Sequence, residues 1–200
     1  MKIIHQRPSN KKPVLIDSFS GLAATAVALI MRSTMEIEII MADYRNPQHA
    51  QDLVELLDSY ATDIMGGGKA LSDYTRRNLA TKLAELPHAF SLVAYADGKA
   101  VAFATCFESF STFACRKIIN IHDIAVLPEY RGRQISQKLL RRIEAIAIER
   151  DCCKLTLEVL EGNEVARNAY RKFGFASYEL DPKTGRALFL EKKISGLVEG

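Results

Sequence analysis

From residue 35 onward, the hydrophobic positions alternate between strand-like and helix-like periods. The stretch MEIEIIMAD (35–43) has a period of two, with Ile37, Ile39 and Met41 on one face. A period of two places successive side chains on opposite faces of a strand, so this pattern predicts a half-buried strand.

Two helices are predicted next. Asn46 followed by a proline is typical of a helix start, and leucines then recur at helical spacing as far as Tyr60. The glycines at 66–68 end this helix, Ser72 begins a second one, and Pro87 ends the second.

A β-rich segment follows. The stretch FSLVAYADGKAVAFATCFESF (90–110) contains two β-rich runs around Asp97-Gly98, and such a dipeptide supplies the positive φ angles of a tight hairpin turn. The apolar run IINIHDIAV (118–126) predicts a further strand.

The last third returns to alternating elements. It predicts a helix over 134–149, a strand over 154–160, and a helix capped by Asn163 and ended by Gly174. Two final strands are expected on either side of Pro182–Gly185. The order β-αα-β-β-β-α-β-α-β-β predicts a mixed α/β (α+β) fold, with one sheet covered by helices.

Residues 1–34 do not follow this organisation. Their apolar run LAATAVALIM (22–31) is far shorter than the roughly 20 residues that cross a bilayer, and no small-residue cleavage site follows it. We expect a poorly ordered extension, or an over-read upstream of a start at Met31 or Met35. Residues 35–200 are expected to form a single domain.

The composition is that of an ordinary globular protein, with 48% hydrophobic residues, 26% charged residues and a formal net charge of +3. Such a mild charge does not favour a nucleic-acid partner, although converging basic residues would suit a small anion. No zinc-ligand spacing or CxxC pair is present, so we expect no metal and reduced, buried thiols in a cytoplasmic protein. The cysteines are Cys106, Cys115, Cys152 and Cys153.

The candidate chemistry begins at YRGRQIS (130–136), which lies between the strand 118–126 and the long helix. The first N–H groups of a helix have no partner within it, and the helix dipole adds positive charge there. With Arg131 and Arg133 beside them, these groups are suited to a pyrophosphate. On composition alone, a solvated basic corner is the alternative.

Two motifs resemble the GNAT acyltransferase superfamily. AVLPEYRGRQISQKLL is similar to its strand–Pro–R/Q-x-x-G-x-G/A–helix signature, with departures at the two glycine positions, Gln134 and Ser136. About 40 residues later, GNEVARNAYRKFGF is similar to N-x-x-A-x-x-x-Y-x-K-x-G-F. The resemblance in element order covers roughly residues 37–193.

This resemblance implies a mixed sheet with helices on both faces and acetyl-CoA in the opening between two parallel strands that splay apart, 118–126 and 154–160. The first strand's edge would hold the pantetheine, and the amides of 132–137 the pyrophosphate. The residues expected at the cofactor are Ile124, Ala125, Val126, Arg131, Gly132, Arg133, Gln134, Ile135, Ser136, Gln137, Asn163, Ala166, Tyr170 and Lys172.

The resemblance also implies that Tyr170 protonates the departing CoA thiolate. Ordinary pKa values of about 10 for tyrosine and about 8.5 for a thiol make this transfer uphill by only about 2 kcal/mol. The alternative is a core aromatic residue on a short helix.

For the general base we favour His122, since an imidazole titrates near neutrality and related small-molecule acetyltransferases carry a glutamate at this position. His122 and Asp123 are neighbours on a strand, so only one is expected to face the opening. A structurally hydrogen-bonded histidine is the alternative. Glu108 and Glu158 are further candidates, the latter also as a paired buried carboxylate.

The sequence therefore predicts an N-acyltransferase that uses acetyl-CoA and a primary amine of a small molecule or protein, by direct attack in a ternary complex. No serine or cysteine lies beside an evident base, although Cys106 stays open as a nucleophile. The alternatives are a non-catalytic CoA-binding sensor and, more remotely, a nucleotide-binding protein, for which no G-x-G-x-x-G is present. We expect no nucleic-acid or membrane partner, and the family's frequent dimers allow a homodimer.

Overall fold

The structure is a computed structural model that describes residues 35–178, 183, 185, 187–192 and 194, and the N-terminal extension expected over 1–34 lies outside them. The elements below all belong to the unit Glu36–Gly200. In chain order they are β1 (Ile37–Met41), α2 (Pro47–Thr62), the 3₁₀ turn η1 (Ile64–Gly66), α3 (Asp73–Ala84), β2 (Ala89–Ala96), β3 (Lys99–Ser111), β4 (Arg116–Val126), the 3₁₀ turn η2 (Pro128–Tyr130), α4 (Ile135–Glu149), β5 (Leu155–Leu157) and α5 (Glu164–Phe173).

The five strands form one mixed sheet in the order β1-β2-β3-β4-β5. The first four are antiparallel neighbours, whereas β4 and β5 run parallel. The β2–β3 hairpin turns at Asp97 and Gly98, whose φ angles are 49° and 81°, as the Asp-Gly pair predicts. The expected mixed α+β class is confirmed.

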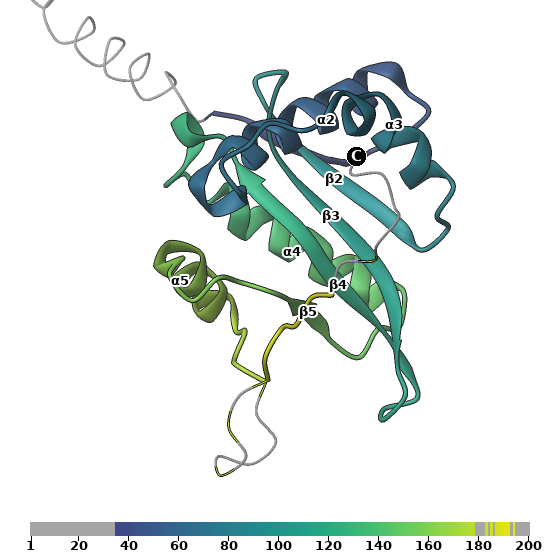
Figure 1. The fold of residues 1–200 in the computed structure, drawn as a ribbon, viewed down its shortest axis with the longest axis vertical. Coiled ribbons are helices and arrows are strands. Elements are labelled where there is room, and N and C mark those ends of the chain that lie inside the picture. Colours follow the sequence, from purple (N-terminus) through teal and green to yellow (C-terminus); the bar gives the residue numbers. More distant parts are fainter. Residues whose placement is uncertain (1–34, 179–182, 184, 186, 193, 195–200) are drawn as a thin grey trace, which may run out of the picture. The chain divides into compact units, whose positions relative to one another are not determined.

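Helices α2 and α3 cover one face of the sheet (Figure 1). Each begins as predicted: the Asn46 side chain accepts hydrogen bonds from the first turn of α2, and Ser72 does so for α3, which satisfies amides that have no partner within the helix. The buried core on this face consists of Ala42, Leu53, Leu56, Leu83, Val93 and Phe103.

Helix α4 covers the opposite face and runs behind the strands in Figure 1. Its buried residues recur at helical spacing, which places the apolar stripe of the helix against the sheet. They are Ile135, Leu139, Leu140, Ile143, Ile146 and Ala147. The predicted strand β1 is formed, with Ile37 and Ile39 partly buried and Glu38 exposed between them. It departs from the predicted alternation at its end, where Ile40 packs against the α2-side core and Met41 is exposed.

A β-bulge interrupts the ladder between β3 and β4. Thr105 is opposite Asp123 and Cys106 is opposite Ile121, so His122 has no partner on β3. The extra residue changes the alternation of side chains at this point of the strand. The unpaired residue lies four residues before the end of β4 at Val126.

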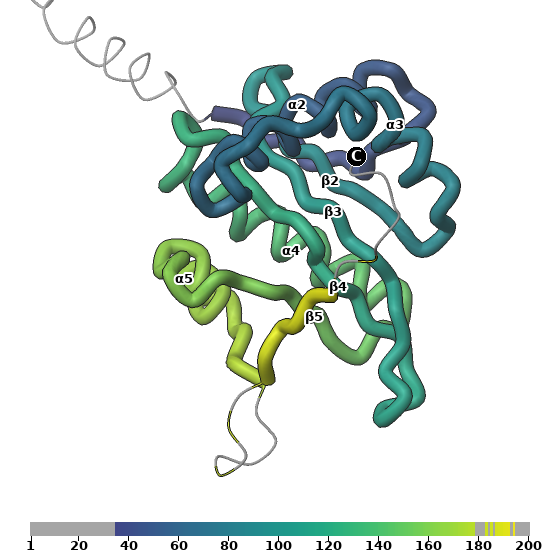
Figure 2. Tube along the Cα trace, in the orientation of Figure 1, coloured from purple at the N-terminus to yellow at the C-terminus, as the bar shows by residue number. Residues whose placement is uncertain are grey.

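Strand β5 is shorter than the predicted 154–160 and pairs with β4 only from Ile119 to Ile121. Figure 2 shows the chain leaving β5 toward α5, while β4 continues away from it. The final two strands expected around Pro182–Gly185 are not formed in the described part of that stretch, where residues 187–192 carry no strand and their apolar side chains are exposed. Residues 179–182, 184 and 186 lie outside the described residues.

Candidate active site

The turn between β4 and α4 has the backbone of an anion site. The first hydrogen bond within α4 runs from the Lys138 N–H to the Gln134 carbonyl, so the N–H groups of residues 135–137 have no partner within the helix. Gly132 has a φ of 77°, and a Cβ added there would meet no atom within 4 Å. The turn is therefore open beside these amides, as a phosphate site requires.

Gln134 occupies this turn in a conformation that favours glycine. Its φ and ψ are 61° and 18°, and its side chain makes no capping hydrogen bond to α4. A left-handed conformation costs a residue with a Cβ about 1 kcal/mol or more relative to glycine. The chain thus keeps the turn without the expected glycine, and the exposed Gln134 side chain does not enter the core.

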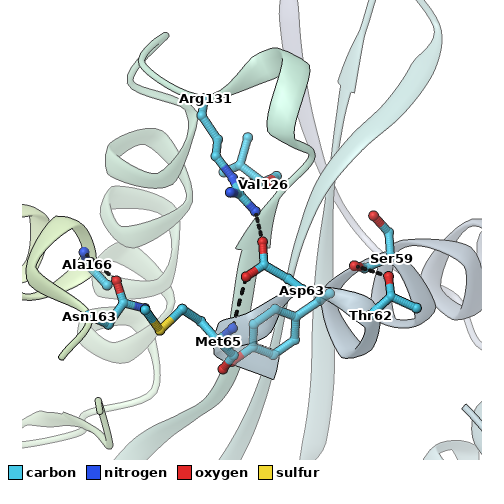
Figure 3. A network of polar contacts seen from close by, with 9 residues as sticks. Ser59, Thr62, Asp63, Met65, Val126, Arg131, Asn163 and Ala166 are labelled. Carbon is cyan, nitrogen blue, oxygen red and sulfur yellow. Dashed lines mark hydrogen bonds and ion pairs between the residues drawn. The ribbon is translucent and has the colours of Figure 1, made fainter. Parts of the chain in front are cut away.

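Arg131 connects this turn to two other elements. Its Nε donates to the carbonyl of Val126 at 3.1 Å, and its terminal nitrogen lies 2.7 Å from an Asp63 carboxylate oxygen at the end of α2 (Figure 3). Arg133 instead reaches the Glu129 carbonyl and stacks over the Tyr130 ring, 5.3 Å from its centroid.

The other residues expected at the cofactor differ in whether their side chains are buried, hydrogen-bonded within the protein or exposed. The side chain of Ile135 is buried in the core, so only its backbone faces the turn. Gln137 donates to the Ala169 carbonyl at 2.9 Å and joins α4 to α5, and Asn163 caps α5 by accepting from the Ala166 N–H at 3.1 Å. Lys172 is exposed in the last turn of α5.

Tyr170 is partly buried on α5, and its ring meets that of Phe175 edge to face, with centroids 5.9 Å apart. Burial raises the pKa of Tyr170 to about 12, and the neighbouring Tyr60 adds to the shift. Its phenol is therefore protonated throughout the physiological pH range, as a proton donor must be.

The bulge corrects the expectation that only one of His122 and Asp123 faces the opening. The His122 ring contacts Phe107, with centroids 5.5 Å apart, and Phe107 packs on the α2-side core. Asp123 acts electrostatically on Tyr60 of α2. Both side chains therefore lie on the α2 side of the sheet, His122 exposed and Asp123 partly buried. Burial raises the pKa of Asp123, while His122 opposes that shift.

Tyr60 is the residue of this site that the sequence did not indicate, because its helical spacing is that of a core residue. Its ring packs edge to face on Phe103, and its pKa is raised by burial, by Asp123 and by Asp63. Tyr60 also raises the pKa of Tyr170, so it interacts electrostatically with α5 as well as with Asp123 of β4. The helix ends two residues later at Thr62, before the glycines that the sequence suggested as its end.

The other candidates from the sequence do not join this group. Glu108 pairs with Lys117 and with Arg150, which follows α4. Glu158 is exposed and accepts from Asn120, so it is not a buried carboxylate. Cys106 is completely buried, and desolvation raises the pKa of its thiol to about 12, which makes it a poor nucleophile.

The sequence also led to expectations about the cysteines, a metal site and a membrane partner. Cys115 and Cys153 are exposed, so the cysteines are not uniformly buried as expected, and all four are free thiols. Within the described residues, no group of three or more metal-ligand side chains comes together. None of the helices described is long and apolar enough to cross a membrane.

Comparison with known proteins gives a family match. The profile of the acetyltransferase (GNAT) family matches residues 37–175. A thialysine N-epsilon-acetyltransferase of Bos taurus is 35% identical over 74 residues, which are 37% of this chain and 43% of that protein. The alignment thus spans less than half the length of this curated relative.

Two solved structures share the fold. The ribosomal-protein-alanine N-acetyltransferase from Brucella melitensis biovar Abortus 2308 superimposes with a TM-score of 0.56 and 23% identity, covering 73% of this chain and 99% of that chain. The aminoglycoside N-acetyltransferase AAC(6')-Iy in complex with CoA gives a TM-score of 0.62 and 17% identity, covering 82% and 99%.

Proposed function

Because the chain belongs to the acetyltransferase (GNAT) family, we propose that it transfers the acetyl group of acetyl-CoA to a primary amine in a ternary complex. One observation carries this proposal. His122 and Asp123 lie on the α2 side of the sheet, one and two residues beyond the last pairing of β4 with β5, and Tyr60 of α2 interacts electrostatically with both Asp123 and Tyr170 of α5. The site would then contain a proton donor for the leaving thiolate, Tyr170, and a proton acceptor for the attacking amine, His122.

The cofactor fits the open turn. Beyond Ile121, β4 has no pairing with β5, so the backbone groups of Ile124 and Val126 that face away from β3 border the opening. The Val126 carbonyl already accepts from Arg131, which leaves the Ile124 groups and the Val126 N–H for the pantetheine. The amides of residues 132–137 would hold the pyrophosphate, with Arg131 and Arg133 supplying charge. The open space beside Gly132 leaves room for the phosphates despite the Gln134 side chain.

Tyr170 is the proposed acid. When the amine displaces the thioester, the sulfur leaves as a thiolate and the Tyr170 hydroxyl gives it a proton. With a phenol pKa of about 12 and an ordinary thiol near 8.5, this transfer is uphill by about 5 kcal/mol. The second N–H proton of the tetrahedral intermediate restores the phenol, so the transfer is followed by a downhill step.

His122 is the proposed base, with Asp123 beside it. The acceptor arrives as an ammonium ion and must lose one proton before it attacks, at a cost of roughly 4.6 kcal/mol for a lysine-like amine at pH 7. His122 takes this proton and releases it to water from its exposed position. The ionised Asp123 compensates the positive charge that forms on the imidazole.

The direct-attack route requires no covalent enzyme intermediate. Cys106, the thiol that the sequence left open as a nucleophile, is sealed in the sheet. The acceptor class stays at the level of a primary amine of a small molecule or a protein. The related proteins described above, which are named for thialysine, aminoglycoside and ribosomal-protein alanine acetylation, support this range.

The test is thiol release from acetyl-CoA across a panel of amines, comprising thialysine, aminoglycosides and peptides with a free amino terminus. We expect turnover on at least one class, with the acetylated product identified by mass spectrometry. Tight CoA binding without thiol release on every amine would contradict the proposal and favour a CoA sensor.

A further inference from the structure

Asp63 lies where α2 ends, and its two carboxylate oxygens face different parts of the chain. One oxygen accepts from the Met65 N–H at 2.9 Å and starts η1. The other accepts from Arg131, 68 residues away, at 2.7 Å. The backbone carbonyl of Asp63 also accepts from Gly66 and Gly68. Asp63 thus anchors residues 63–72, which we call the connector, between α2 and α3.

The connector has little freedom at its start. A Cβ on Gly66 would come within 1.9 Å of the Tyr60 carbonyl oxygen, so Gly66 packs directly on the last turn of α2. Tyr60 in turn interacts electrostatically with Tyr170 and Asp123. A displacement of Asp63 therefore reaches the side of the sheet that holds the proposed acid and base.

Arg131 uses two of its donors on the protein, one on Val126 of β4 and one on Asp63. The planar guanidinium fixes the directions of its remaining N–H groups once these two are bound. Asp63 has a lowered pKa, caused first by the Met65 N–H and then by Arg131, so it stays ionised. The carboxylate therefore holds the arginine in one orientation beside the open turn of Gly132.

We propose that Asp63 is a positioning residue, which orients Arg131 for the phosphates of the cofactor and so makes the order of the connector depend on cofactor binding. This inference rests on the proposed use of acetyl-CoA. It adds a physical connection between the cofactor turn and the helices α2 and α3.

Removal of the Asp63 carboxylate has opposite expected effects on CoA affinity, depending on whether its charge or its orientation of Arg131 matters more. A carboxylate near the phosphates repels them, so by charge alone Asp63→Asn tightens CoA binding. If Asp63 orients Arg131, the same substitution weakens it. Asparagine keeps an oxygen that can accept from the Met65 N–H, so η1 retains its cap.

The first measurement is the dissociation constant of CoA by calorimetry. We expect Asp63→Asn to weaken binding about threefold to fivefold, which is the range of a partly exposed ion pair. Arg131→Lys should do the same, since an ammonium cannot contact Val126 and Asp63 in the same fork. The matched control is Glu129→Gln, which removes from the same turn a carboxylate that pairs with Lys99. This variant should leave binding unchanged or tighter.

The second measurement is hydrogen exchange of peptides that cover the connector amides Gly66 and Gly68, with and without CoA. We expect CoA to slow this exchange in the unmodified chain and in Glu129→Gln, but not in Asp63→Asn. This readout needs no knowledge of the acceptor amine.

The outcomes separate the two proposals. Suppose that the unmodified chain binds CoA and acetylates amines. If Asp63→Asn then binds CoA as tightly as the unmodified chain, and CoA still slows hydrogen exchange of its connector amides, only the positioning role of Asp63 is wrong. If the unmodified chain does not bind CoA, the proposed function fails and this inference fails with it. Asp63→Glu keeps the negative charge and should bind CoA more tightly than Asp63→Asn. If Asp63→Glu binds no more tightly, while CoA still slows hydrogen exchange of its connector amides, the positioning role is also contradicted.

Discussion

His122 and Asp123 are adjacent in the sequence and yet lie on the same side of the sheet, because His122 is the unpaired residue of the bulge in β4. A regular strand would have sent one of them to the α4 side. The bulge therefore gives the proposed site an imidazole and a carboxyl group together, where the sequence suggested a choice between them.

Asp123→Asn should change the pH dependence of turnover. The pKa of Asp123 is raised by burial, so the carboxylate takes up a proton as the pH falls through that raised value. The support for a protonated His122 is then lost, and we expect kcat/KM to decline on the acid side. In Asp123→Asn the rate should be lower by about 10²-fold, and the part of the acid-side decline that comes from protonation of Asp123 should be absent. An unaltered acid side in the variant would remove Asp123 from the mechanism.

Asp123→Asn should stabilise the folded protein near neutral pH, although it lowers turnover. A carboxyl group whose folded pKa lies above its unfolded value destabilises the fold increasingly as the pH rises from the unfolded value through the folded one. Asp123→Asn should therefore melt at a higher temperature than the unmodified chain at pH 7, and the difference should shrink toward pH 4. Thermal unfolding at several pH values measures this, and a lower melting temperature at pH 7 would contradict it.

Tyr170→Phe should lower kcat by about 10²-fold or more while leaving CoA affinity nearly intact, because only the proton donor is removed. Initial rates and CoA titrations on the same preparation separate the two effects. Tyr74→Phe is the matched control, since Tyr74 is exposed on α3 and should keep full activity. Unchanged turnover in Tyr170→Phe would end its assignment as the acid.

Gln134→Gly should stabilise the protein by up to about 1 kcal/mol, because it relieves the left-handed conformation of a residue with a Cβ. Gln134 makes no capping hydrogen bond, so none is lost. Urea unfolding gives the free energy, with Gln134→Ala as the control that keeps the Cβ. A destabilised glycine variant would show that the Gln134 side chain has a contact role.

Gly132→Glu should abolish tight CoA binding, because it places a negative charge in the open space beside the turn. Gly132→Ala is the control for backbone strain, since any Cβ is disfavoured at a φ of 77°. We expect Gly132→Ala to bind CoA more weakly than the unmodified chain but far more tightly than Gly132→Glu. Equal affinities in all three would displace the proposed phosphate site.

The elements with local signals were predictable from the sequence. Asn46, Ser72 and Asn163 are helix caps, and Asp97-Gly98 is a hairpin turn, because each depends on a few adjacent residues. The family resemblance was likewise visible in two local motifs, AVLPEYRGRQISQKLL and GNEVARNAYRKFGF, and the fold class followed from the order of the predicted elements.

The features that depend on tertiary pairing were not predictable. The bulge at His122 results from the register between β3 and β4, and the contact between Asp63 and Arg131 joins elements 68 residues apart. The end of β5 at Leu157 also depends on pairing rather than composition. Tyr60 was hidden for a related reason, since a residue at core spacing is not distinguished from one that borders a site.

Strand β4 continues for five residues after its last pairing with β5 at Ile121. The groups that this edge offers to a cofactor are N–H and C=O groups, and every residue except proline supplies both. An alanine scan of Ile124–Val126 would therefore leave them in place and suggest that the segment is unimportant. The Leu127 N–H donates to the Val101 carbonyl, so in the β3–β4 ladder the Ala125 N–H faces β3, and the N–H groups of Ile124 and Val126 face the free edge. Proline at Ile124, or an amide-to-ester replacement there, would remove a main-chain donor from this edge and reveal a contribution that side-chain mutagenesis cannot detect.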